Sequence, residues 1–318
     1  MSEPLIQVKD LCKYFKVRED GKKATLKAVD GVTFDIAKRE TLGLVGESGC
    51  GKTTTGLLII NLLKPTSGDV LFEDRSVFDP GNKKNIRRNM QIIFQDPYAS
   101  LNPRLRVADI VGEPLVIHGL AKGPAIDARV KQLLGYVGLS AHQANRFPHE
   151  FSGGQRQRIG IARALAVEPR FIVCDEPVSA LDVSVQSQVL NLLKDLQDEL
   201  DLTYLFIAHG LNVIKHVSDR VGVMYLGTIV EMAEASDIYH SPLHPYTKAL
   251  MSAIPIPDPT VARERVLLEG SVPSPIDPPV GCVFSARCPK ATDECFASRP
   301  PYREDLPNHW VACFHVEQ

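Results

Sequence analysis

The sequence predicts an α/β protein built on a mainly parallel sheet, because strand-like and helix-like segments alternate along the chain. Five short apolar runs are typical of buried strands. They are residues 5–8, 32–36, 92–94, 171–174 and 203–208. Residues 184–200 have the clearest helical pattern, with Val189, Leu193 and Leu196 on one face. Such alternation predicts a parallel sheet packed between helices.

The most specific motif is a glycine-rich loop that follows an apolar strand-like run at residues 41–45. The loop fits the pattern G-x-x-x-x-G-K-[ST], and its residues are Gly46, Glu47, Ser48, Gly49, Cys50, Gly51, Lys52 and Thr53. Its glycines let successive N–H groups turn toward a phosphate, and a helix expected at residues 54–63 adds positive partial charge. We therefore expect the loop, with Thr54, to bind ATP or GTP. Lys52 is expected to reach the β- and γ-phosphates and Thr53 to ligate Mg²⁺.

Two adjacent carboxylates, Asp175 and Glu176, follow the strand-like run 171–174. Parallel sheets bind ligands at the carboxyl ends of their strands. Asp175 suits Mg²⁺ and Glu176 suits an attacking water. Taken alone, the pair could equally cap the next segment, but the phosphate loop upstream favours a hydrolytic site.

Charge and hydropathy exclude several classes of protein. The 318 residues carry a net charge of −2 with no basic stripe, so we expect no nucleic-acid partner. The longest apolar stretch, near residues 56–63, is too short to span a bilayer, and we expect a cytoplasmic protein. Cysteines in such a chain are expected to be reduced or to hold metal.

The chain changes character near residue 240. Thirteen of its 23 prolines lie between Pro242 and Pro307, and a helical pattern survives only at residues 246–253. Aromatic residues and four of the seven cysteines interrupt this tail, so we expect it to be ordered. Disorder remains an alternative for residues 255–280.

Residues 151–155 carry a resemblance to a known family. Their sequence, Phe-Ser-Gly-Gly-Gln, resembles the signature sequence of ABC-type ATPases. The resemblance implies that Ser152, Gly153, Gly154 and Gln155 lie at a helix N-terminus and cap the γ-phosphate of a nucleotide held by an opposing subunit. A helix N-terminus is physically suited to that anion. A serine-capped surface helix is the alternative for the motif alone.

Further residues match the same family in order and spacing. By resemblance, Gln95 contacts Mg²⁺ and the attacking water and relays to membrane partners, Asp182 crosses the dimer interface, and His209 touches the γ-phosphate. One position departs from the pattern, since the family usually has an aspartate after the histidine and this chain has Gly210.

The resemblance also implies an architecture. It predicts a RecA-like nucleotide-binding domain of ABC type at residues 1–240, with a β-subdomain and a helical subdomain at about 96–168. Residues 241–318 then form an irregular, cysteine-containing extension. An aromatic residue is expected to stack on the adenine, and the alignment favours Phe15, with Tyr14 as the alternative.

Three longer segments narrow the branch of the family. Residues 94–104, 240–250 and 270–275 are similar to ATP-binding subunits of dipeptide and oligopeptide importers, a branch that also contains nickel importers. This implies a peripheral ATPase at the cytoplasmic face of the membrane. Its implied partners are a second, homologous ATPase subunit, two membrane permeases and an extracytoplasmic substrate-binding protein.

Other functions remain as alternatives. Nickel or another small solute could be the cargo, because the residues that select the substrate lie on other subunits. A soluble ABC ATPase acting on nucleic acid is less favoured, since the chain has neither a long coiled-coil insertion nor a second cassette. The signature segment argues against a phosphate-loop kinase or GTPase.

The tail cysteines suggest a second site. Cys282, Cys288, Cys295 and Cys313 are separated by five, six and seventeen residues, which is not a zinc-ribbon spacing. Four thiolates can hold zinc or an iron–sulfur cluster, and the family resemblance implies a [4Fe-4S] cluster that orders the tail. Zinc, with His309 or His315 as a substitute ligand, and unligated thiols remain open.

Overall fold

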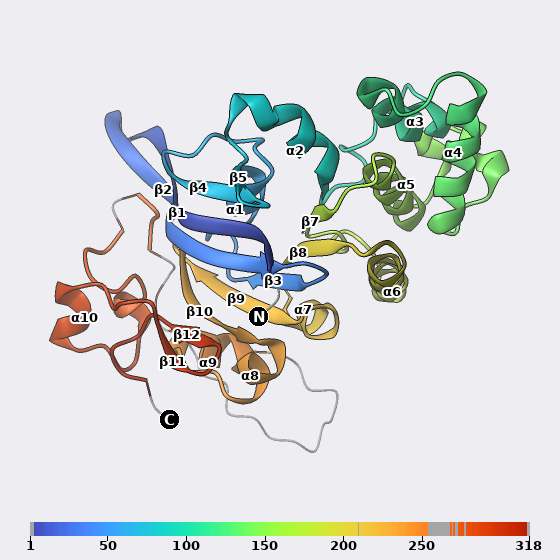
Figure 1. The fold of residues 1–318 in the computed structure, drawn as a ribbon. Coiled ribbons are helices and arrows are strands. Elements are labelled where there is room, and N and C mark those ends of the chain that lie inside the picture. The colour runs from blue at the N-terminus through green and yellow to red at the C-terminus, as the bar shows by residue number, and fades with distance from the viewer. Residues whose placement is uncertain are drawn as a thin grey trace, which may run out of the picture.

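The computed structural model describes residues 3–208, 210–253, 268, 270, 273–276 and 278–316. This part of the chain forms two β-sheets with helices around them (Figure 1). Helix α1, which spans Lys52–Ile59, contacts β2 of the smaller sheet and β7 and β8 of the larger one. The residues before α1 therefore lie where the two sheets meet.

The smaller sheet is antiparallel throughout and has the strand order β2-β1-β4-β5. Its strands are β1 (Pro4–Glu19), β2 (Lys22–Ala37), β4 (Ser67–Phe72) and β5 (Arg75–Ser76). Residues 5–8 and 32–36 were both predicted to join a mainly parallel sheet, and that prediction is wrong for both. They pair antiparallel with each other, because the tight turn at Asp20 and Gly21, both with positive φ, makes β1 and β2 a hairpin.

The larger sheet has the order β11-β12-β10-β9-β3-β8-β7-β6. Neighbours from β9 to β6 are parallel, whereas β10, β12 and β11 add antiparallel strands at one end. The bounds are β3 (Thr41–Val45), β6 (Met90–Ile93), β7 (Phe171–Asp175), β8 (Thr203–Ala208), β9 (Arg220–Tyr225), β10 (Thr228–Glu234), β11 (Arg303–Leu306) and β12 (His309–Val311). The predicted parallel core is thus confirmed for β3, β6, β7 and β8.

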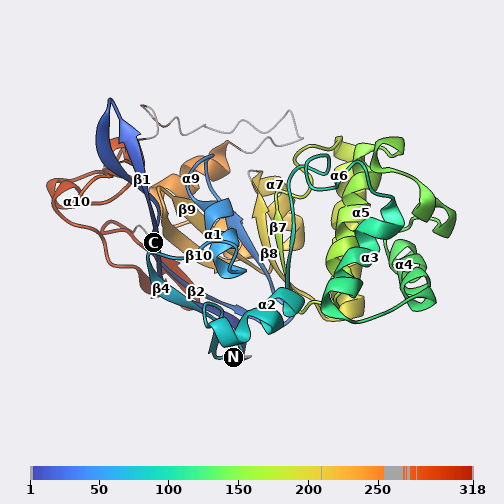
Figure 2. The same ribbon diagram turned by 90° about the horizontal axis from the view of Figure 1, so that it is seen from above.

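The helices fall into groups around the large sheet. Helices α3, α4 and α5 pack on one another at one side of the molecule, and the extension with α10 lies at the other (Figures 1 and 2). The remaining bounds are α2 (Lys83–Asn89), α3 (Val107–His118), α4 (Pro124–Tyr136), α5 (Gly153–Leu165), α6 (Val183–Leu200), α7 (Leu211–Val217), α8 (Ala235–His240), α9 (Pro245–Ser252) and α10 (Asp293–Ala297). The helix predicted at residues 184–200 is confirmed as α6, whereas α1 ends before residue 63.

A fully buried carboxylate fastens the extension to the large sheet. Glu231 of β10 accepts hydrogen bonds from the backbone N–H groups of Leu243 (2.6 Å) and His244 (3.0 Å). The ring of His309 in β12 lies 2.7 Å from the same carboxylate. A buried charge is tolerated where such partners satisfy its hydrogen bonds. The cluster therefore holds the first residues of the extension and strand β12 against β10.

His244 makes the stability of this junction dependent on pH. Burial lowers the pKa of its imidazole to about 4, against the opposing effect of the Glu231 charge. The neutral ring accepts a hydrogen bond at Nδ1 from the N–H of Tyr246.

Because an unfolded histidine titrates near pH 6.5, the unfolded chain binds this proton at a higher pH than folded His244 does. Stability is therefore present above pH 6.5 and falls as the pH drops toward 4, by about 3 kcal/mol. Urea unfolding across this range measures the loss. His244→Asn, which keeps an acceptor, should flatten the slope, and an unchanged slope would contradict the assignment.

Candidate nucleotide site

The phosphate loop, residues 46–53, runs from β3 into α1 and has no room for side chains at two of its glycines. A Cβ on Gly46 would lie 2.1 Å from the carbonyl oxygen of Met224, and one on Gly51 would lie 2.1 Å from that of Ala28. Both residues also have positive φ, of 152° and 107°. Only glycine fits these positions, so the pattern read from the sequence reflects close approach of three backbone segments.

Two side chains at the start of α1 carry polar groups of the kind that bind a nucleotide and a metal ion. The ammonium of Lys52 donates to the carbonyl oxygens of Gly46 (2.7 Å) and Glu47 (3.0 Å), which holds it against the loop. The hydroxyl of Thr53 donates to Oδ1 of Asp175 at the end of β7 (2.9 Å). Hydroxyl and carboxylate oxygens are ligands that Mg²⁺ accepts, so the donor set fits that ion.

Glu176 and Gln95 meet beside this pair. The amide of Gln95, which follows β6, donates to Oε2 of Glu176 (2.8 Å), which follows β7. Glu176 is almost fully buried and has a φ of 48°, while its N–H donates to Ile207. A non-glycine residue in this region costs on the order of 1–3 kcal/mol and is common at functional sites. The predicted catalytic pair is thus brought together.

The signature segment begins helix α5. Ser152 and Gln155 form a reciprocal cap, in which each side chain accepts a hydrogen bond from the N–H of the other residue. The side chain of Gln157 donates to the carbonyl oxygen of Phe94, which ties α5 to the Gln95 loop. Within the described part of the chain, no hydrogen bond joins residues 152–155 to residues 46–54.

Two further predicted residues, and the glycine that departs from the family pattern, have different outcomes. Asp182 stands at the N-cap of α6 without a side-chain capping bond, so capping does not explain its presence. His209 lies outside the described residues. A Cβ on Gly210 would meet no atom within 4 Å, and its φ of −91° suits any residue. The unusual glycine is therefore not required by the backbone.

The two aromatic residues predicted to stack on the adenine, Tyr14 and Phe15, make different contacts. The hydroxyl of Tyr14 donates to Asp30, and the ammonium of Lys27 lies 5.4 Å from its ring centroid. The ammonium of Lys13 lies 5.0 Å from the ring centroid of Phe15. The role of Phe15 in stacking stays a prediction.

The extension holds the phosphate loop through contacts with Glu47, and the sequence did not predict these contacts. The hydroxyl of Tyr246 accepts the N–H of Glu47 (2.9 Å), and the guanidinium of Arg287 donates to both carboxylate oxygens (2.8 and 3.3 Å). The Arg287 side chain is 8% exposed. Burial alone would lower its pKa, but the hydrogen bonds to Glu47 and Tyr225 raise it, so it stays charged. The contact joins residues 240 positions apart.

Removing the Arg287 guanidinium should loosen the phosphate loop. We expect Arg287→Ala to weaken ATP binding about tenfold, because a bidentate, charge-assisted pair is worth roughly 1.5–3 kcal/mol and only part of it acts on the ligand. Titration with a fluorescent ATP analogue measures the change. Arg303→Ala, at an exposed ion pair of the same extension, is the matched control. Equal affinities for the two variants would show that Glu47 needs no anchor.

The four tail cysteines line one small cavity with a volume of about 10 Å³. Cys282, Cys295 and Cys313 are buried and Cys288 is half-buried. Burial raises the pKa of Cys282 to about 11 and also raises the pKa of Cys288 and Cys313. Within the described residues, no three His, Cys, Asp or Glu side chains are spaced to hold a single metal ion. Four thiolates are soft ligands of the kind that hold an iron–sulfur cluster, but the cavity in this structure has room for about one water.

Comparison with known proteins agrees with this geometry. The ABC transporter family matches residues 29–179, and the C-terminal region of oligopeptide/dipeptide transporters matches residues 230–295. The putative oligopeptide transport ATP-binding protein YkfD of Bacillus subtilis is 56% identical over 317 residues, covering 98% of this chain and 95% of that protein. The oligopeptide transport ATP-binding protein OppF of Escherichia coli is 52% identical over 324 residues, covering 98% and 96%.

Solved structures show the same fold. The cbiO1 protein of Clostridium perfringens, part of an ABC transporter complex, has a TM-score of 0.65 at 26% identity, over 76% of this chain and 92% of its own. A bacterial ABC transporter cassette solved as a dimer has a TM-score of 0.64 at 31% identity, over 72% and 98%. The predicted α/β fold of ABC type is thereby confirmed for the nucleotide-binding part of the chain, and the cysteine-containing extension stays a prediction. The chain belongs to the ABC transporter family of ATP-binding proteins, in the branch that includes oligopeptide transport ATP-binding proteins.

Proposed function

We propose that the protein is the ATP-hydrolysing subunit of an importer of dipeptides or oligopeptides. The observation that carries the proposal is the joint presence of the ABC transporter family match, which includes the phosphate loop, and of the C-terminal region found in oligopeptide and dipeptide transporters. Identities of 50–56% to oligopeptide transport ATP-binding proteins over 98% of the chain support the same cargo class.

Hydrolysis follows from how the chain positions charges. The phosphate-loop N–H groups and Lys52 would hold the β- and γ-phosphates, while Glu176, oriented by Gln95, would accept a proton from the attacking water. Thr53 and Asp175 would hold Mg²⁺, which neutralises charge on the transferring phosphoryl group when bound. Gly46 to Thr54 and Phe15 would form the rest of the ATP site.

The proposal requires a second ATPase subunit. Ser152, Gly153, Gly154 and Gln155, at the N-terminus of α5, would cap the nucleotide of that partner, with Asp182 at the interface. Two observations favour this arrangement: residues 152–155 make no hydrogen bond to the phosphate loop of their own chain among the described residues, and a similar cassette was solved as a dimer. A heterodimer with a homologous chain and a role for His209 at the γ-phosphate belong to the same proposal.

Membrane permeases are the other proposed partners. Within the described residues, no helix is both long and apolar enough to cross a membrane. Helix α3 exposes Val116 and Ile117, which are 60% and 71% accessible. Exposed apolar side chains of this kind are typical of protein contacts. We assign the chain a peripheral position on the cytoplasmic face, beside two permeases fed by an extracytoplasmic binding protein.

The domain division and the tail site complete the proposal. Residues 1–240 would form the nucleotide-binding domain, with a helical subdomain at about 96–168, and residues 241–318 the extension. Cys282, Cys288, Cys295 and Cys313 would hold a [4Fe-4S] cluster, which cross-links the segments that carry them. Their shared cavity and soft donor set support this assignment. Binding would release thiol protons, since burial keeps these groups protonated.

The function is tested by reconstituting the chain with its permease pair, its homologous ATPase and its binding protein in vesicles. We expect ATP-dependent uptake of a labelled dipeptide or oligopeptide. Glu176→Gln should reduce hydrolysis at least a hundredfold and abolish uptake while ATP still binds, because it removes the proposed base. Lys52→Ala should lose ATP binding as well. Uptake of nickel or another solute without peptide would contradict the proposed cargo.

The tail site is tested by metal and sulfide analysis of protein purified without oxygen. We expect about four iron and four sulfide per chain, as a cubane held by four thiolates requires. Cys288→Ser should lose the visible absorbance and leave the tail more sensitive to proteolysis, while ATP binding survives. Cys174→Ser, a buried cysteine of β7, is the control. Zinc without sulfide, or no metal, would rule out the cluster.

A further inference from the structure

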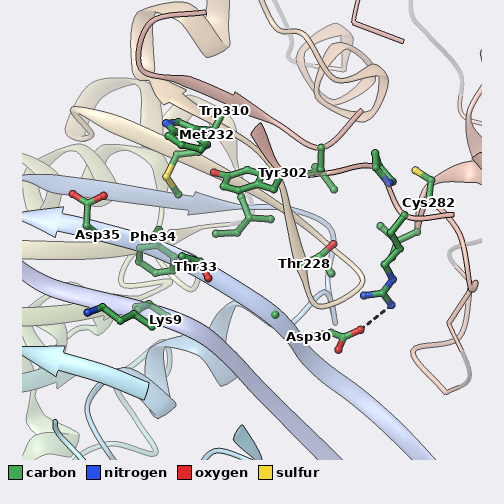
Figure 3. Close-up of a pocket in the computed structure, with 18 of the residues that line it drawn as sticks. Lys9, Asp30, Thr33, Phe34, Asp35, Thr228, Met232, Cys282, Tyr302 and Trp310 are labelled. Carbon is green, nitrogen blue, oxygen red and sulfur yellow. Dashed lines mark ion pairs between the residues drawn. The ribbon is translucent and has the colours of Figure 1, made fainter. Parts of the chain in front are cut away.

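A cavity of about 710 Å³ lies between β2, β10 and the extension (Figure 3). Sites for small ligands have volumes of roughly 300–1,000 Å³ and mostly apolar walls with a few polar groups. None of the residues that line this cavity belongs to the proposed ATP site. The cavity is therefore a candidate site distinct from the ATP site, and it shares Cys282 with the cysteine cavity.

One wall of the cavity is the edge of a β-sheet. Strand β2 is the outermost strand of its sheet, and in the described residues it pairs only with β1 apart from one bridge between Leu26 and Ile276. Gly31, Thr33 and Asp35 of β2 line the cavity. Two of these residues already have backbone partners, since the N–H of Gly31 donates to Sγ of Cys12 in β1 (3.2 Å) and the carbonyl oxygen of Asp35 accepts from Arg220 of the other sheet (3.3 Å). The backbone of Thr33, between them, is therefore the part of this edge that a ligand would meet. A free strand edge binds an extended peptide through its backbone.

The other walls are apolar and aromatic. Ile229, Val230 and Met232 of β10 are buried at the floor. The rings of Tyr302 and Trp310 stack with centroids 5.7 Å apart, and Figure 3 shows them across the cavity from Thr33 and Phe34. These surfaces suit an aliphatic or aromatic side chain.

Charges of both signs stand at each end. Arg299 is paired with Asp30 at 2.8 Å (dashed in Figure 3), and Lys9 and Asp35 lie at the opposite end. An extended molecule with an ammonium at one terminus and a carboxylate at the other complements this distribution.

We propose that the cavity binds a short free peptide with apolar side chains, extended along the edge of β2. This inference rests on the proposed function, because import would supply such peptides. A route to the ATP site is present: the N–H of Asp30 donates to Gly227 (2.8 Å), whose own N–H donates to Cys50 of the phosphate loop (2.9 Å). Peptide binding and ATP binding are then coupled, and each ligand changes the affinity for the other by the same factor.

The chain carries its own probe for this site, since Trp310 is its single tryptophan. Titrating the purified full-length chain with trileucine should give a saturable change in Trp310 fluorescence. Trileucine with methylated backbone nitrogens should bind about tenfold more weakly, because it cannot donate to the strand edge. No saturable response, or equal affinity for the methylated peptide, free leucine or a fatty acid of similar length, would overturn the proposal.

A matched pair of variants locates the response. Ala312→Phe fills the cavity and should abolish it, whereas Ala297→Phe adds the same ring on exposed α10 and should leave it intact. Equal binding by both variants would overturn the proposal. Should Ala312→Phe fail to fold, as judged by circular dichroism, the methylated peptide on the unaltered chain still decides. Peptide uptake by the reconstituted complex without a Trp310 response would overturn this inference alone and leave the proposed function standing.

Discussion

The phosphate loop is wedged between three parts of the chain, and the rest of the structure is organised around that constraint. Gly46 packs on a carbonyl of β9 and Gly51 on one of β2, each at a distance that excludes a Cβ. Glu47 is held by the extension through Tyr246 and Arg287. One loop of eight residues therefore connects both sheets and the tail. Since its N–H groups must point toward a phosphate, a displacement of any of the three parts would change how the loop holds the nucleotide.

The proposed catalytic groups fall into two sets, one assembled within this chain and one proposed to act on the nucleotide of a partner subunit. Hydrogen bonds link Thr53 to Asp175 and Gln95 to Glu176, so the ends of β6, β7 and the loop form one unit. The signature residues belong to α5, which is tied to the Gln95 loop through Gln157 and Phe94. A rotation of the helical group would therefore shift Gln95 together with residues 152–155. This linkage gives a physical route by which a proposed membrane partner could act on the Gln95–Glu176 pair.

The sequence predicted features whose cause is local and missed those whose cause is distant. The phosphate loop, the carboxylates after β7 and the amphipathic α6 depend on spacing over a few residues, and all three were predictable. Residues 5–8 and 32–36 were wrongly expected in the parallel sheet, because an apolar run carries no information about its partner strand. The Arg287–Glu47 contact joins positions 240 residues apart, and no pattern in the sequence pairs them. The irregular spacing of the four cysteines did not by itself predict that they line one cavity, and the cluster expected there came from the family resemblance.

The extension is more than an addition to the ATPase, because a charged side chain of the extension binds the phosphate loop. Arg287 lies next to Cys288 in the chain, and its guanidinium is committed to Glu47 rather than to solvent. Phe284, between Cys282 and Arg287, packs against Tyr225 and Tyr246, and Tyr246 also bonds to Glu47. The segment that lines the cysteine cavity is therefore the segment that fixes the phosphate loop. Ordering that segment reduces the conformational freedom that ATP binding would otherwise have to remove.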